Sequence, residues 1–497
     1  MNAIYDFLDN RLSPTLVRDI RQLVRNRFIT VMLNLYVLIL TLITLAAITF
    51  QSARTQLEGT GEGLYATDLI FFFLFTFIVV NLYTAVMMSQ ERITNDLMFT
   101  TTIPPSGFVF GKLSSALVLA GMLFCVTLPF ITIAYMLRGI DLQTILQTCF
   151  LVILMLGFSL SMTILIFSRV KTYVMMIGLL ILYAILCWSG VFGFIGILVS
   201  FLGARWGGII GTAPGLWQLA IGGVFVIMTA LVILTAAMSR VASTNTNRIM
   251  PFRITYTVYM LLTLGASFAI TAYYSHAVMS LDALPLFMVF FHYGFFLLLI
   301  VISTCGRDNW GLRLKRTIPQ NLILRCLLFP FYSGAINGMV WLLGIACVLV
   351  GCFFAAAHIS SSPMLSNFDD ARETLKYGFT WVVMAYAFCT LAMMIRIKFL
   401  KRYLTPENTW LLALAIFGGF YATYFTIQFL LTDDRARYGF YLEADSIERT
   451  LFIAALWALL ASILFVPWAL RQLPMFTPED VNQNRDGNGA DKSEPQT

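Results

Sequence analysis

Long apolar runs recur along this chain and restrict its fold more than any other feature. Each run contains roughly 20 or more mostly apolar residues, enough for an α-helix to cross the hydrocarbon core of a bilayer. Because that core holds no water, the backbone must satisfy its own hydrogen bonds there, and a helix does so within one segment. The sequence therefore predicts an all-α polytopic membrane protein with about 12 transmembrane helices. The predicted spans are residues 28–50, 66–88, 108–137, 142–167, 172–200, 214–238, 252–274, 281–303, 322–357, 374–396, 406–432 and 448–470.

Composition indicates the same class of protein. Hydrophobic residues make up 59% of the chain and charged residues 11%, whereas soluble domains contain about 45–50% apolar residues. The spans and their short connectors use nearly all 497 residues, which leaves no room for a large soluble domain. Residues 1–27 are polar and basic, and the first apolar run is long enough to remain as an anchor, so we expect no cleavable signal peptide.

The basic residues are distributed unevenly between the connectors. The connectors on the same side as both termini hold a roughly threefold excess of the 32 Lys and Arg residues. Such an excess marks the cytoplasmic side, so both termini are predicted to be cytoplasmic. The net charge of +7 then reflects membrane topology, and no nucleic-acid partner is expected.

The N-terminal residues 1–27 are predicted to contain a basic amphipathic helix. Pro14 suits its first turn, and the helix would lie flat on the inner leaflet. An alternative is that these charges only orient the first span. Apolar residues recur at helical spacing at Leu16, Val17, Ile20, Leu23 and Val24, whereas the other side carries Arg18, Asp19, Arg21, Arg25 and Arg27.

A polar segment, residues 89–112, separates the second and third runs. It is predicted to form one or two helical turns over residues 91–99, to break at Pro104 and to restart as a helix at Ser106. The segment would then hold a short helix lying across the membrane surface. A plain cytosolic turn between two spans is the alternative. Its charged residues are Glu91, Arg92, Asp96 and Lys112.

Residues 107–112 contain two glycines and a lysine, as phosphate-binding loops do. The spacing is one residue too short for G-x-x-x-x-G-K-[ST], and Leu113 stands where a hydroxyl is required. No other segment has Walker features. We therefore expect this chain not to be an enzyme by itself, to have no catalytic residues and to bind no cofactor.

In this order, the features resemble the membrane subunit of an ABC-2 type ABC transporter. The resemblance covers residues 1 to about 240, including a glycine-rich and aromatic connector between the fifth and sixth spans. The motifs that carry it are Pro14-Thr15-Leu16-Val17-Arg18-Asp19-Ile20-Arg21-Gln22, Glu91-Arg92, Asp96-Leu97, Thr102-Ile103-Pro104, Ser106 and Gly111-Lys112.

The resemblance implies partners and roles. The N-terminal helix would be the connecting helix, with Arg18, Arg21 and Arg25. Two separate ABC ATPase subunits, which use ATP and Mg, would bind a coupling helix, and accessory subunits would be possible partners beside the lipid bilayer. A bacterial inner membrane and export of the cargo are also implied. The coupling-helix residues would be Glu91, Arg92, Asp96, Thr102, Pro104, Gly111 and Lys112.

The second half of the chain repeats the plan. Thr317-Ile318-Pro319 and Arg307 follow Thr102-Ile103-Pro104 and Arg92 by the same number of residues, and each lies between the second and third span of its half. We therefore predict two six-helix ABC-2 type repeats, residues 28–240 and a divergent 241–472. Residues 473–497 are predicted to be a disordered cytoplasmic tail. The second coupling element would contain Arg307, Arg313, Arg316 and Pro319.

A few polar side chains fall inside predicted spans. His292 is the one ionisable group placed deep in the bilayer, which makes it a candidate functional residue, although a neutral histidine bonded between helices is the favoured interpretation. Asn81 and Asn337 are predicted to join neighbouring helices. The eight cysteines show no metal-ligand or disulfide pattern, so no metal site is expected.

Three functions remain after these observations. The first is the permease subunit of an ATP-driven exporter. The second is an ion-coupled secondary transporter, also often built from repeats. It is disfavoured because no Asp or Glu is predicted at the middle of a span. The third is a non-transporting membrane partner of an ABC ATPase.

Overall fold

The computed structural model is helical throughout the residues that it describes, and no strand occurs among them. Seven of its helices are long and apolar enough to cross a membrane. The all-α class is therefore confirmed, and the chain is an integral membrane protein. The described residues are 14–52, 61–93, 104–137, 140–168, 177–178, 213–242, 247–274, 284–304, 312–359, 368–400, 409, 412–413, 415–416, 418–419, 444–472 and 476.

Two compact units divide the chain, Met1–Ser243 and Thr244–Thr497. The division falls close to residue 240, where the sequence placed the boundary between two transmembrane domains. Each unit is described by itself below.

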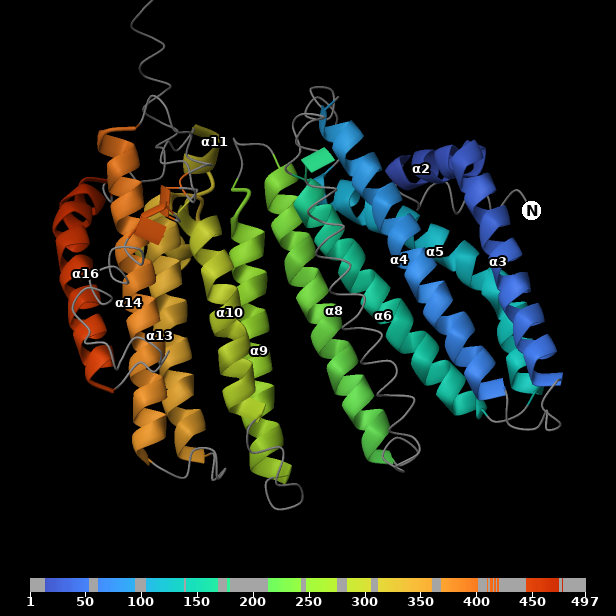
Figure 1. Ribbon diagram of the computed structural model, residues 1–497. Helices are drawn as coiled ribbons and strands as arrows, with labels where there is room; N and C mark the ends of the chain where they lie inside the picture. The colour runs from blue at the N-terminus through green and yellow to red at the C-terminus, as the bar shows by residue number, and fades with distance from the viewer. Residues whose placement is uncertain are drawn as a thin grey trace, which may run out of the picture. The chain divides into compact units, whose positions relative to one another are not determined.

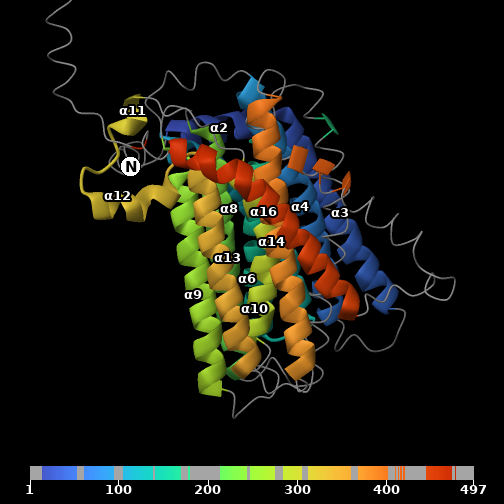
Figure 2. The same cartoon turned by 90° about the vertical axis from the view of Figure 1, so that its left-hand side faces the viewer.

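In unit 1 the first four long helices run alternately up and down, and a short one, α2, lies across their ends (Figures 1 and 2). Asn26 separates α2 from the first spanning helix, because its side-chain oxygen accepts a hydrogen bond from the backbone N–H of Phe28 at 3.0 Å and so caps the new helix. The helices are α2 (Pro14–Arg25), α3 (Arg27–Ser52), α4 (Gly61–Ile93), α5 (Pro105–Met136), α6 (Leu142–Phe167) and α8 (Ala213–Val241).

Hydrogen bonds between side chains join the helices of unit 1, as expected where apolar surface alone gives little driving force for association. Asn81 of α4 donates to the hydroxyl of Ser159 at 3.2 Å and accepts from that of Thr163 at 2.7 Å, both on α6. Tyr36 of α3 bonds Thr127 of α5 at 2.7 Å. Asn81 therefore joins two helices, as the sequence predicted.

In unit 2 the first four long helices also run alternately up and down (Figures 1 and 2). Within it, α9 packs on α10, α10 on α13, α13 on α14 and α14 on α16. Its helices are α9 (Met250–Tyr274), α10 (Leu284–Thr304), α11 (Leu312–Lys315), α12 (Leu322–Leu328), the 3-10 helix η4 (Phe329–Phe331), α13 (Ala335–Ile359), α14 (Phe368–Lys398) and α16 (Ala444–Gln472).

One predicted span has the wrong bounds. The apolar run 322–357 is two helices, since α12 and η4 precede a turn and only α13 has the length and composition of a span. A continuous helix over the run would measure about 54 Å, against a hydrocarbon core of about 30 Å. Pro330 and Gly334 lie where the chain bends.

The predicted count of twelve spans stays a prediction. Ten long helices of the described part occupy predicted spans, and seven of these meet the length and composition of a membrane helix. The predicted span 172–200 lies outside the described residues except for 177–178, as does 406–432 except for a few residues.

Arg253, in the first turn of α9, holds the bend before α13. Its side chain is fully buried, and its guanidinium donates to the backbone carbonyls of Pro330 at 2.7 Å and Tyr332 at 2.6 Å. A third contact reaches the carbonyl of Gly334 at 3.4 Å. The guanidinium also lies over the ring of Trp341, 5.7 Å from its centroid. One side chain thus donates to several backbone carbonyls at the change of helix direction.

Replacing Arg253 by Met is expected to loosen this bend. Methionine fills much of the space but donates no hydrogen bond, so the loss is about 2–3 kcal/mol. Thermal unfolding of the purified chain and the rate of proteolysis between α12 and α13 measure it. Arg471→Met, at an exposed position of α16, is the control. Equal unfolding temperatures for the two variants would contradict the assignment.

Candidate functional site

The candidate site is built on α2. Its arginines Arg18, Arg21 and Arg25 are exposed, as the predicted connecting helix requires, and Leu23 is buried on the opposite side. Asp19 departs from the prediction, which grouped it with the arginines. Its side chain is fully buried. The apolar face of α2 therefore carries a carboxylate into the protein.

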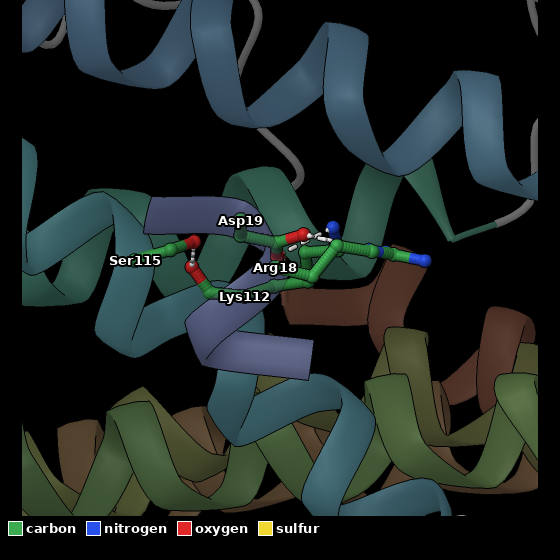
Figure 3. Close-up of polar contacts among 4 residues, drawn as sticks. All are labelled: Arg18, Asp19, Lys112 and Ser115. Atoms are coloured by element: carbon green, nitrogen blue, oxygen red, sulfur yellow. Dashed lines mark hydrogen bonds and ion pairs between the residues drawn. The ribbon is translucent and has the colours of Figure 1, made fainter. Parts of the chain in front are cut away.

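Asp19 meets a buried lysine from the third spanning helix. The Nζ atom of Lys112 on α5 lies 2.7 Å from Oδ2 of Asp19, and the two side chains are 2% and 0% exposed. Arg18 reaches the other carboxylate oxygen, Oδ1, at 3.3 Å, but its own side chain is 51% exposed. Figure 3 shows Asp19 between the two basic groups. A buried pair of opposite charges thus joins α2 to α5.

Local sequence places Lys112 on the buried face of α5. The helix begins at Pro105, and Phe108, Lys112 and Ser115 follow at spacings that put them on one side. The ammonium group lies 5.8 Å from the centroid of the Phe108 ring. The hydroxyl of Ser115 donates to the carbonyl of Lys112 at 2.9 Å. Asp19 is the only acidic residue of α2, so it is the counter-charge that this helix can supply.

This arrangement changes the role expected for Gly111 and Lys112. Both are buried, so neither presents a side chain to a docked ATPase in this structure. Removing one partner of a buried ion pair leaves an uncompensated charge and costs about 3–5 kcal/mol. In this structure Lys112 therefore holds α2 on α5, and its expected role as an ATPase contact stays a prediction.

The structure describes only some of the other predicted coupling residues. Glu91 and Arg92 belong to the last turn of α4, which continues to Ile93, so they do not begin a separate helix. Their side chains lie outside the described residues, as do Asp96 and Thr102 altogether. Pro104 is exposed and extended, and its carbonyl accepts from the backbone N–H of Phe108 at 3.2 Å. The third span thus restarts at Pro105, one residue before the predicted Ser106.

The segment predicted to be the second coupling element precedes a different arrangement of helices. After Pro104 the spanning helix begins at once, whereas after Pro319 the chain forms α12 and η4 before α13. The hydroxyl of Tyr332 donates to the carbonyl of Thr317 at 2.5 Å, and Ile318 is buried beside it. Arg316 is exposed, the side chain of Arg313 on α11 is not described, and Arg307 lies outside the described residues.

Part of the predicted disordered tail is packed. Phe476 is buried in a cluster with Leu314, Ile318 and Tyr332. Its ring meets that of Tyr332 edge to face, with centroids 5.2 Å apart. The prediction of disorder is therefore wrong at this residue. The rest of 473–497 lies outside the described residues.

His292 has partners on both ring nitrogens. Its Nδ1 lies 3.3 Å from the hydroxyl of Tyr256, and its Nε2 lies 2.8 Å from that of Thr263, both on α9. This geometry is that of a histidine joining α10 to α9, the favoured sequence interpretation. Asn337 differs from its prediction, since its amide donates to the carbonyl of Phe329 at 2.5 Å and so holds η4 against α13.

Sequence reasoning missed Asp68. It lies in the second turn of α4, inside the apolar segment, and is fully buried. Neither carboxylate oxygen has a hydrogen-bond partner among the described residues. The sequence search looked for acidic residues at the middle of each predicted span. Asp68 lies near the beginning of its span, in the second turn of α4, and was therefore not found.

Neither a cluster of metal ligands nor a similar known protein assigns a role to this site. Within the described residues, no three His, Cys, Asp or Glu side chains gather as metal ligands would. Comparison of the chain with models of protein families, with curated proteins and with solved structures found no match.

Breaking the Asp19–Lys112 pair is expected to destabilise unit 1. Lys112→Met and Asp19→Asn should each cost about 3–5 kcal/mol, because each leaves one buried charge unpaired. The double variant should cost clearly less than the two single losses together. The midpoint of thermal unfolding in one detergent is the measurement.

Arg18→Gln is the matched control for this cycle. Its half-exposed side chain should contribute about 0–1 kcal/mol. Additive losses at Asp19 and Lys112, within about 0.5 kcal/mol, would show that the two groups do not interact.

Proposed function

We propose that this chain is the membrane-spanning permease subunit of an ATP-driven exporter of the ABC-2 type. Separate ATPase subunits would bind the cytosolic segment between α4 and α5 and drive movement of the spanning helices. The order of the amphipathic helix, the first two spans, the E-R…T-I-P segment and the third span supports this proposal.

The buried Asp19–Lys112 pair is the observation that carries it. α4 is helical to Ile93 and α5 begins at Pro105, so a rigid helix enters the segment and another leaves it. α5 in turn carries α2, through a contact that costs about 3–5 kcal/mol to break. A partner that displaced residues 94–104 would therefore move α5 and α2 together. This mechanical continuity is what coupling of ATP hydrolysis to a membrane domain requires.

Reversing the charges at Glu91 and Arg92 is expected to release the ATPase. The affinity-tagged chain would be purified from its native membrane and the ATPase that accompanies it quantified, with its stoichiometry. If these residues form charge pairs with the ATPase, Glu91→Arg with Arg92→Glu should reduce the bound amount about tenfold or more. No ATPase in the unaltered preparation would contradict the proposal.

Two controls separate docking from folding. Lys398→Glu tests for a general effect of reversing a charge, because Lys398 is exposed and lies in the last turn of α14. Lys112→Met should retain the bound ATPase per folded chain, because the Lys112 side chain is buried. Loss of the ATPase on Lys112→Met alone would return this lysine to the docking surface.

An ion-coupled carrier is the second candidate, and Asp68 is the observation that favours it. Buried ionisable residues inside spans often bind the coupling ion, and Asp68 has no partner among the described side chains. If the exporter proposal holds, the chain alone in liposomes should pass no protons or sodium ions under an imposed gradient. Ion flux that Asp68→Asn abolishes, and that Asp141→Asn at an exposed site leaves intact, would favour the carrier.

A further inference from the structure

A short helix of unit 2, α12, stands apart from the spanning helices. It lies across the axes of α9 and α13, near one end of both (Figure 2). Both helices begin at that end, which is the predicted cytoplasmic side. The side chain of Asn321 accepts from the backbone N–H of Ile323 at 3.2 Å and caps the start of α12. Arg253 holds the bend that follows η4. Specific bonds therefore hold the start of α12 and the bend that follows η4.

The surface of α12 is apolar and uncovered. None of its residues is buried, and Leu322, Ile323 and Leu327 are 68%, 76% and 65% exposed. Covering such a side chain fully is worth roughly 1.5–3 kcal/mol. Since α12 lies near the ends of α9 and α13 (Figure 2), the boundary between hydrocarbon and headgroups is the medium expected to meet these side chains.

Basic residues adjoin this apolar surface. Residues 312–331 contain Arg313, Lys315, Arg316 and Arg325, and no Asp or Glu. Arg325 lies on α12 itself and donates to the carbonyls of Pro319 at 3.3 Å and Gln320 at 3.1 Å. Its charge is thereby held beside the turn that also carries the exposed Arg316. A positive group next to inserted apolar side chains matches the chemistry of an anionic phospholipid surface.

We propose that α11, α12 and the turn between them form a membrane-surface anchor that binds anionic phospholipids of the cytoplasmic leaflet. The anchor holds the Thr317-Ile318-Pro319 segment of unit 2 against the lipid surface. It does not depend on an ATPase partner, so it stands or falls separately from the exporter proposal.

Cys326 offers a probe inside the anchor. It is an exposed, free cysteine on α12. The full chain would be labelled with an environment-sensitive fluorophore and placed in nanodiscs of phosphatidylcholine with increasing phosphatidylglycerol. The same preparation of Cys326→Ala gives the signal of the other cysteines for subtraction. Quenching by spin-labelled lipid is compared with quenching by aqueous iodide.

We expect the Cys326 signal to be quenched by lipid, shielded from iodide and strengthened by phosphatidylglycerol. Leu322→Ser with Ile323→Ser should remove the lipid quenching, and Lys315→Gln with Arg316→Gln should remove the dependence on phosphatidylglycerol. Lys398→Gln, an exposed basic position of α14, should leave both unchanged. The substituted side chains of Leu322, Ile323 and Arg316 are exposed, so an unchanged unfolding temperature in detergent verifies folding.

Three results would overturn the proposal. Quenching by iodide would place α12 in water. Shielding from both quenchers would place a protein surface over it, from a partner or a second copy. Lipid quenching that does not change with the phosphatidylglycerol content would show that the apolar side chains insert without recognition of anionic headgroups.

Discussion

In each unit a buried basic group attaches the first element to the beginning of the third spanning helix. In unit 1, Lys112 near the start of α5 pairs with Asp19 of α2. In unit 2, Arg253 at the start of α9 binds the carbonyls that precede α13. A buried charge without a partner costs free energy in a membrane protein. Breaking either contact would therefore destabilise the packing of the two elements that it joins. The arrangement of helix ends at this side of each unit depends on this constraint.

The two attachments give the units different surfaces at the side predicted to be cytoplasmic. In unit 1 the pair leaves the arginines of α2 exposed and the segment between α4 and α5 next to rigid helices. In unit 2 Arg253 is buried and holds the bend before α13. The segment before that bend contains the apolar helix α12, and the tail residue Phe476 packs beside it on Ile318 and Tyr332. The proposed permease would therefore present one surface suited to a protein partner and one suited to lipid.

Much of the fold could be predicted because the bilayer imposes it. Run length and hydropathy placed α3, α5 and α6 within a few residues of their observed bounds. They failed at residues 322–357, where summed hydropathy does not record that the chain bends at Pro330 and Gly334. Of the candidate site, periodicity found α2 and its exposed arginines. It misplaced Asp19, because polarity along a helix does not reveal a counter-charge many residues away.

The sequence by itself determined that this is a helical membrane protein with an amphipathic N-terminal helix, since those properties follow from local composition and spacing. Only the tertiary structure decided that Lys112 faces Asp19, that both nitrogens of His292 are bonded and that Asp68 is buried without a described partner. The reason is physical. The state of a buried polar group is set by the atoms around it, and helix packing brings those atoms from distant parts of the chain.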